Sequence, residues 1–382
     1  MSGERLRAVY HLRGNAAEAG EIAREICVEQ TVEFPVELIH REDVREGIIG
    51  RLVDLRPLGE DLHRAEVDYP IEVAGRELTQ LLNVLMGNIS LKRGIRLVGF
   101  DLPPGLAALY KGPRFGRQGV RGLVGRPAGP LLCTAVKPMG LSPHELAILA
   151  GQFAAGGIDA VKDDHGLCDQ SFCRFEERVR RCAAAVNEAN AKHGGRCIYL
   201  PNVTAPCDEL IERVHKAVEW GAGGFVLSPG LSGFDFMRRI AEDDSIALPI
   251  FSHPAWQGWA IVSGDSGISH GTIFGRIARL AGADATIFPS FRGRFSFSRE
   301  ECLDIVQCTE CDLGGLNPIF PVPAGGMSLP RVPELISFYG PDVVLLIGGD
   351  LHRHGPDLAA SCRRLVDLAR NARPPEIPRP AG

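Results

Sequence analysis

Residues 131–165 have the sequence LLCTAVKPMGLSPHELAILAGQFAAGGIDAVKDDH, in which a helical stretch separates two short, mainly apolar runs. The runs are Leu131–Val136 and Gly157–Lys162, and the helical stretch is Pro143–Ala155. Both runs are mainly apolar rather than alternating between apolar and polar residues, which is typical of strands buried on both faces. A buried strand, a helix and a second buried strand predict one parallel β/α unit.

This succession occurs eight times after Leu131. Eight units in about 240 residues predict a closed (β/α)8 TIM barrel, with a site at the carboxyl ends of its strands. An open, doubly wound sheet is the alternative. The strands are Leu131–Val136, Gly157–Lys162, Arg196–Asn202, Gly223–Ser228, Leu248–His253, Asp284–Phe288, Pro318–Val322 and Asp342–Ile347; the helices are Pro143–Ala155, Phe172–His193, Asp208–Trp220, Phe234–Glu242, Gly271–Leu280, Arg299–Cys311, Arg331–Phe338 and Pro356–Ala369.

The first third of the chain has a different pattern. Arg5–His11 and Val32–Ile39 predict strands, and Ala16–Cys27 predicts a helix. Gly112–Gly129 is dense in Gly, Arg and Pro, which marks a domain boundary. We expect an α+β domain over residues 1–125 and the barrel domain over residues 126–382.

Composition and charge exclude several classes of protein. Lys and Arg total 42 against 47 Asp and Glu, and no Lys/Arg-rich run occurs, so a nucleic-acid or anionic-membrane partner is not expected. The start, MSGERLRAVY, lacks a secretory apolar core, so we expect a cytoplasmic protein. The eleven cysteines are then reduced thiols. Cys308 and Cys311 form a lone CxxC, whereas a structural zinc site needs four ligands.

The second predicted strand ends with the strongest chemical signal. Lys162 is followed by Asp163, Asp164 and His165. Lys162 and Asp164 share a face of the strand, so both can converge on one bound cation. The alternative is a structural Lys–Asp pair that closes the top of the barrel.

Other strand ends add candidates for substrate binding. Gly325-Gly326 and Gly348-Gly349 follow the last two strands, where glycine lets backbone N–H groups approach a phosphate. Asp350 opposes this because it would repel the dianion, unless it points away or pairs with Arg353.

Two further strand ends carry ionisable side chains. Thr134 and Lys137 end the first strand, and Lys137 is a point charge or a proton carrier. His253 ends the fifth strand, either as a site base or as a core histidine.

These residues together resemble the large subunit of ribulose-bisphosphate carboxylase (RuBisCO), and more closely the RuBisCO-like proteins. The resemblance covers nearly the whole chain. AREICVEQTVE is similar to the motif with a catalytic glutamate, here Glu29, and LLNVLMGNISL to the motif with a metal-proximal asparagine, here Asn88. The remaining matches are GGIDAVKDDH, CTAVKPMGLSP, FSHPA, PAGGMSLPRVPE and IGGDLHRHGP.

The resemblance implies a ferredoxin-like N-terminal domain and a homodimer in which Glu29 and Asn88 of one chain complete the barrel site of the other. It implies that Lys162 takes up CO2 as a carbamate and binds Mg²⁺ together with Asp164. The third family ligand is a glutamate, and His165 stands there. Imidazole weakens Mg²⁺ binding and favours Mn²⁺, Fe²⁺ or Zn²⁺, or else His165 acts as a base.

Further departures argue against ribulose-bisphosphate carboxylation. Pro254 replaces an arginine that follows His253, and Ala324 replaces a serine. The apolar stretch 287–289 replaces a histidine, and Arg294 occupies the position of the mobile-loop lysine that faces CO2. One phosphate site remains, at the glycine pairs after the last two strands.

The superfamily's common chemistry is metal-stabilised enolate formation. We expect this chemistry on a monophosphorylated keto-sugar or keto-acid. The preferred reaction is decarboxylation or transcarboxylation–hydrolysis of 3-oxo-isoapionate 4-phosphate, because Glu29 and Asn88 look more like the relatives that act on this sugar acid. The alternatives are enolisation of 2,3-diketo-5-methylthiopentyl 1-phosphate in methionine salvage and a non-catalytic role.

Overall fold

The computed structural model describes residues 2–295 and 297–372. Its N-terminal part is a five-stranded sheet in the order β10-β4-β1-β3-β2. The pairs formed by β1, β2, β3 and β4 are antiparallel, whereas β10 comes from the barrel part of the chain and pairs in parallel with β4. The strands are β1 (Arg5–Arg13), β2 (Arg51–Gly59), β3 (Leu62–Pro70), β4 (Ile95–Asp101) and β10 (Gly267–Ile268).

Helix α1 follows β1 for a clear local reason. The Asn15 side chain accepts the amide of Glu18, whose own side chain accepts the amide of Asn15, a capping box that starts the helix. The other N-terminal helices are short, apart from α4. The helices are α1 (Ala16–Glu29), α2 (Glu42–Gly47), α3 (Ile71–Ala74), α4 (Leu78–Met86) and α5 (Pro104–Ala107).

The strand predicted over Val32–Ile39 is wrong. The structure has a single 3-10 turn there, Val36–Leu38. Pro35 precedes this turn, and a proline cannot donate a ladder hydrogen bond, so it opposes a central strand.

The eight-strand barrel is confirmed. Strands β13-β5-β6-β7 and β8-β9-β11-β12 form two parallel sets, which are joined by a bridge between Asn202 and Val226 and by packing of β12 against β13. The barrel strands are β5 (Leu131–Val136), β6 (Ala160–Asp163), β7 (Ile198–Leu200), β8 (Phe225–Leu227), β9 (Ile250–Ser252), β11 (Ala285–Pro289), β12 (Phe320–Ala324) and β13 (Val344–Leu346).

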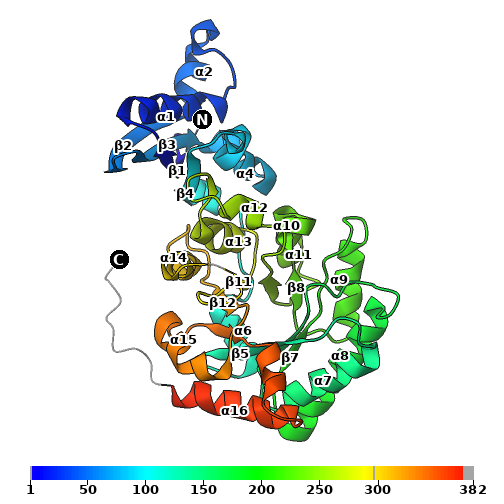
Figure 1. Ribbon diagram of the computed structural model, residues 1–382. Helices are drawn as coiled ribbons and strands as arrows, with labels where there is room; N and C mark the ends of the chain where they lie inside the picture. Colours follow the sequence, from blue (N-terminus) through cyan, green and yellow to red (C-terminus); the bar gives the residue numbers. More distant parts are fainter. Residues whose placement is uncertain (1, 296, 373–382) are drawn as a thin grey trace.

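Helices surround this ring (Figure 1). One departs from regular geometry, since residues Thr272–Ile277 form a π-helix that continues into α13. No helix among the described residues is long and apolar enough to span a bilayer. The helices are α7 (Pro143–Ala155), α8 (Phe175–His193), α9 (Leu210–Glu219), α10 (Pro229–Ser232), α11 (Phe234–Glu242), α12 (Gly258–Ile261), α13 (Ala278–Leu280), α14 (Arg299–Glu310), α15 (Val332–Tyr339) and α16 (Leu358–Asn371).

The glycine-rich segment expected to mark a domain boundary contains a helix, α6 (Gly116–Val124). Val120 and Val124 of this helix join the core inside the barrel, together with strand residues such as Phe251. The same helix buries Arg117 and Arg121, which bond to Glu310 and Asp342. Helix α6 is therefore packed against the barrel interior and is not a linker.

Candidate active site

The carboxyl ends of the barrel strands surround a cavity of about 1200 Å³. Ten of the thirteen predicted site residues line it, although they come from segments far apart in the chain. They are Lys137, Lys162, Asp164, His165, His253, Arg294, Gly325, Gly326, Gly348 and Gly349.

Lys162 is more deeply buried than Asp164, with 3% of its surface exposed against 9%. Its Nζ donates to the backbone oxygen of Asp163 at 2.7 Å. Burial lowers the pKa of this amine, and the nearby Asp164 only partly opposes that shift. A lowered pKa supplies the neutral amine that reaction with CO2 requires.

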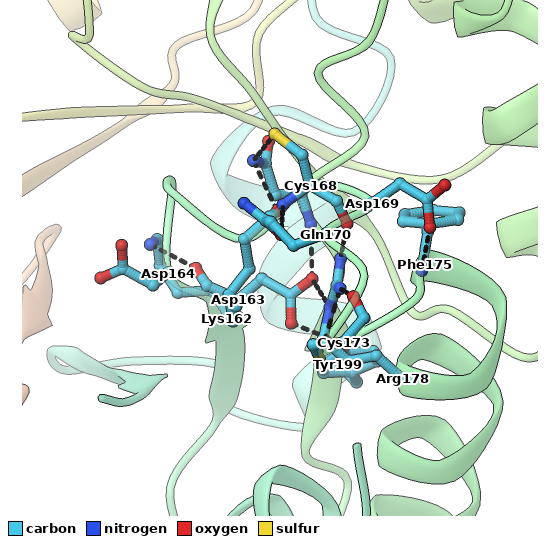
Figure 2. A network of polar contacts seen from close by, with 12 residues as sticks. Lys162, Asp163, Asp164, Cys168, Asp169, Gln170, Cys173, Phe175, Arg178 and Tyr199 are labelled. Carbon is cyan, nitrogen blue, oxygen red and sulfur yellow. Dashed lines mark hydrogen bonds and ion pairs between the residues drawn. The ribbon is translucent and has the colours of Figure 1, made fainter. Parts of the chain in front are cut away.

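Asp163 faces the other way and anchors the strand from behind. Its carboxylate accepts from Arg178 Nε at 3.0 Å, Tyr199 Oη at 2.5 Å and the Asn202 amide at 3.0 Å. Figure 2 shows Asp164 on the side away from Arg178 and Tyr199. The sequence analysis missed this anchor, although a charged Arg178 on the same helix face as buried Phe175 and Cys182 is a signal for a buried partner.

Asn202 is a second residue that the sequence analysis left without a role. Its side-chain amide donates to the backbone oxygens of His165 at 2.9 Å and Leu167 at 3.0 Å. Asn202 is fully buried. It therefore holds in place the loop that carries His165.

Asp164 is paired rather than free. Lys137 Nζ lies 2.5 Å from Asp164 Oδ2, and the Gly166 amide donates to Oδ1 at 3.0 Å. Burial alone would raise the pKa of Asp164, but the bonds from Lys137 and Gly166 outweigh it and lower the pKa to about 2. The structural Lys–Asp pairing considered from the sequence thus exists, but with Lys137.

His165 and His253 form a stacked pair, with ring centroids 4.4 Å apart. His165 Nδ1 lies 3.3 Å from Asp164 Oδ1. His253 Nδ1 accepts the Ala255 amide at 3.2 Å, which leaves the ring hydrogen on Nε2. Burial, followed by the charge of Lys162, moves the pKa of His253 well below its usual value. His253 is thus a neutral, partly buried ring that forms part of the cavity wall.

A divalent cation, implied by the resemblance, needs several donors at this strand end. Asp164 offers a carboxylate and His165 an imidazole, but a bare lysine offers no ligand while it is protonated. Across residues 2–295 and 297–372, no three His, Cys, Asp or Glu side chains are placed to hold a metal ion. The donor set fits a cation once Lys162 carries CO2, because the carbamate supplies the missing oxygen.

The glycine pairs lie at the rim that the sequence indicates. Gly325 and Gly326 have φ of +84° and +87°, which side-chain-bearing residues rarely adopt. A Cβ at Gly348 or Gly349 would touch nothing within 4 Å, so protein packing does not require glycine there.

Asp350 does not pair with Arg353. Its carboxylate accepts the Leu329 amide at 2.8 Å and lies 3.1 Å from His354 Nε2. These contacts fix the carboxylate, while Arg353 also lines the cavity.

Three predicted residues are not in the cavity wall. Thr134 is buried, and because side chains alternate along a strand it lies on the face opposite Ala135 and Lys137, which do line the cavity. The structure therefore does not bring Thr134 to the cavity wall, where the sequence analysis expects a substrate contact. Asn88 Nδ2 donates to Glu29 Oε1 at 3.0 Å in the N-terminal part, so these two lie together outside the wall of their own chain's cavity.

Part of the cavity is apolar. Pro254, Ile287, Phe288 and Ala324, which we call the apolar wall, stand at or beside the departures from the carboxylase pattern and line the cavity. Phe274, Phe297 and Met327 add apolar surface to the same cavity.

Residues 118–369 match the family model for the catalytic domain of the ribulose bisphosphate carboxylase large chain. The chain belongs to this family. Among its relatives, 5-methylthioribulose-1-phosphate isomerase of Rhodospirillum rubrum is 40% identical over 349 residues, 91% of this chain and 91% of that protein. The 2,3-diketo-5-methylthiopentyl-1-phosphate enolase of Geobacillus kaustophilus is 34% identical over 319 residues, 82% of this chain and 76% of that protein.

Solved structures of the RuBisCO family agree with the fold. The Rubisco-like protein from Rhodopseudomonas palustris has a TM-score of 0.87 and 36% identity, covering 97% of this chain and 99% of that one. The dimeric archaeal Rubisco from Hyperthermus butylicus has a TM-score of 0.85 and 26% identity, covering 97% and 90%. These findings place the chain among RuBisCO-like proteins, and the relatives named carry isomerase and enolase names rather than a name from the 3-oxo-isoapionate group.

Proposed function

We propose that this chain catalyses proton transfer next to the ketone of a monophosphorylated sugar derivative whose other end is apolar. The substrate class is that of 5-methylthioribulose 1-phosphate, for isomerisation, or of the related diketone, for enolisation. The observation that carries the proposal is the apolar wall, which shares one cavity with Lys137, Asp164 and two glycine pairs.

The apolar wall favours a methylthio group over a second phosphate. Burial of apolar surface contributes about 25 cal/mol per Å², or about 0.8 kcal/mol for each CH2 group. A phosphate dianion against Pro254, Ile287 and Ala324 would lose its hydration without gaining a cationic partner from them. The wall is therefore complementary to a thioether, while the glycine pairs take the single phosphate through backbone N–H groups.

The chain's own residues can move the proton. Lys137, held by Asp164, places an amine at the cavity surface that exchanges a proton with a carbon beside the ketone. His253 Nε2–H donates a hydrogen bond to the ketone oxygen and then to the enolate. A divalent cation bound by Asp164, His165 and carbamylated Lys162 would add Lewis-acid stabilisation of that oxygen.

Carbon–carbon bond cleavage of a sugar acid such as 3-oxo-isoapionate 4-phosphate is the second candidate. The observation that favours it is Arg294, a cavity-lining guanidinium whose charge acts on His165. A guanidinium pairs well with a substrate carboxylate. We rank this candidate after proton transfer, because the apolar wall and the names of the relatives support a methylthio sugar phosphate.

We also propose that the site is shared between two chains, with the partner's N-terminal region closing the cavity. Glu29 and Asn88 are hydrogen-bonded to each other and away from their own cavity. The test mixes two inactive variants, Glu29→Gln and Lys137→Met, under conditions that exchange subunits. One site of each hybrid dimer is then intact, so activity should return; a mixture that stays inactive would show that each chain works alone.

The experiment that tests the proposed reaction is ¹H NMR of 5-methylthioribulose 1-phosphate in D2O with bicarbonate and Mg²⁺ or Mn²⁺. We expect deuterium to enter the carbons beside the ketone and an isomer to accumulate. Lys137→Met should stop the exchange, whereas Lys216→Met, on the exposed face of α9, should not.

A second substrate, 3-oxo-isoapionate 4-phosphate, distinguishes proton transfer from C–C bond cleavage. Release of labelled CO2 from ¹³C-labelled 3-oxo-isoapionate 4-phosphate, without exchange on the methylthio sugar, would replace proton transfer by C–C cleavage. No reaction with either compound and either metal ion would leave a non-catalytic binding role.

A further inference from the structure

The CxxC pair lies at the carboxyl end of α14, outside the active-site cavity. Cys311 is the C-cap residue, and its amide still donates to the Gln307 oxygen at 2.8 Å, so its Cα keeps the helical position. Helix geometry places residues three apart at a Cα–Cα distance of about 5 Å. Disulfides have Cα–Cα distances of roughly 4.4–6.8 Å, and the spacing of Cys308 and Cys311 lies within this range.

Two guanidinium groups lie near the pair, one buried (Arg279) and one partly buried (Arg276). Arg279 is almost fully buried and places Nη1 3.7 Å from Cys311 Sγ and 2.7 Å from the Cys311 backbone oxygen. The charges of Cys311 and Cys308 raise the pKa of Arg276 against the effect of burial. Positive charge near a thiol favours the thiolate.

The pKa values of the two thiols are shifted in opposite directions. The hydrogen bond from Cys308 lowers the pKa of Cys311 most; burial opposes it, and Arg276 and Arg279 add to it, so the pKa is about 6. The same hydrogen bond, followed by burial, raises the pKa of Cys308. Cys311 is partly exposed while Cys308 is buried, so a reagent reaches the thiolate first.

A metal site does not explain the pair. In the part of the chain that the structure describes, no third His, Cys, Asp or Glu side chain joins these sulfurs in a group that could hold a metal ion. Asp304 Oδ1 lies 3.8 Å from Cys308 Sγ, but Asp304 Oδ2 already accepts the Gly271 amide. The pair is therefore a free dithiol.

We propose that Cys308 and Cys311 form a redox-active dithiol that closes to an intramolecular disulfide with low-molecular-weight disulfides as oxidant. The Cys311 thiolate attacks the oxidant, forming a mixed disulfide and releasing one small thiolate. Cys308 then loses its proton and attacks the Cys311 sulfur, forming the protein disulfide and releasing the second small thiol. The two protein thiols are oxidised, and the small disulfide is reduced to two thiols.

The first test uses the intact, folded protein and needs no variant. Alkylation with iodoacetamide is followed at each cysteine by peptide mass spectrometry over a pH series, with the exposed Cys207 as internal reference. The rate at Cys311 should rise with a midpoint near pH 6, about two units below an ordinary thiol. A midpoint equal to that of Cys207 would refute the activated thiolate.

The second test is incubation with oxidised glutathione, followed by peptide mapping without reduction. We expect Cys308 and Cys311 to be joined in one peptide, with both protected from later alkylation. Cys308→Ser should trap glutathione on Cys311, and Cys311→Ser should leave Cys308 unmodified. Glutathione that stays on Cys311 of the unaltered chain, or zinc that co-purifies and is lost only in the double serine variant, would overturn the proposal.

Discussion

Substitution of Arg178 by Met tests the anchor behind the active-site strand. Arg178 and Asp163 are both 0% exposed and lie 3.0 Å apart. Arg178 also donates to the backbone oxygens of Cys168 at 2.8 Å and Cys173 at 3.1 Å. Met keeps much of the side-chain volume, so the change removes charge and donors rather than creating a large cavity.

The expected loss of folding free energy follows from Asp163, whose buried carboxylate is left without a charged partner. A buried carboxylate that loses its partner costs about 3–5 kcal/mol, and the two orphaned carbonyl groups add about 1 kcal/mol each at most. Asp163→Asn should cost a similar amount, because it leaves the guanidinium of Arg178 unpaired. In the double variant neither charge remains, so its cost should fall below the sum of the single costs by at least about 2 kcal/mol.

The assay is urea unfolding at one fixed protein concentration, since the stability of the proposed dimer would depend on concentration. Arg180→Met is the control, because Arg180 lies on the same helix in an exposed pair with Glu176 and should change stability by less than about 0.5 kcal/mol. A cost below about 1 kcal/mol for Arg178→Met, or additive single costs, would refute the buried-pair reasoning.

Three shorter predictions concern the cavity. Lys162→Ala should abolish activity with any divalent cation, measured as initial rate, and full activity would remove Lys162 from the metal site. His165→Glu should tighten Mg²⁺ binding by calorimetry with bicarbonate present, because Mg²⁺ prefers oxygen, and unchanged affinity would place His165 outside the ligand set. Asp164 has a folded-state pKa lowered to about 2, so its contribution to stability is present above the unfolded value near 4 and is lost as pH falls towards 2. Acid unfolding of Asp164→Asn should therefore lack that part of the pH dependence, and an identical profile would contradict the pairing with Lys137.

The barrel could be predicted from the sequence because each strand is buried on both faces and is followed by a long helix. The prediction of secondary structure failed in two segments where the hydrophobic pattern is misleading. Pro35 interrupts the apolar run Val32–Ile39, and the structure has only a 3-10 turn there. In α6, three glycines and the lack of a long apolar run obscure a helix whose stability comes from burial of Val120 and Val124 in the barrel.

The candidate site could be located because parallel strands bring their carboxyl ends to one rim, whatever their separation in sequence. The face of the strand on which each side chain lies was predicted less well from the sequence. Alternation puts Thr134 behind Ala135 and Lys137, and this could have been deduced from spacing alone. The contact of Lys137 with Asp164 could not be deduced from the sequence, because it depends on how closely the ends of two neighbouring strands approach each other.

Alternation also explains why three charged residues stand in a row at the carboxyl end of β6. Lys162 and Asp164 face the cavity, and Asp163 between them faces Arg178 and Tyr199. The main-chain oxygen of Asp163 also accepts the Lys162 amine, so the anchor and the reactive side chain share one residue. Movement of Asp163 would displace Lys162 directly. The buried ion pair therefore fixes the position of the active-site lysine, and Arg178→Met should reduce turnover as well as stability even though Arg178 does not line the cavity.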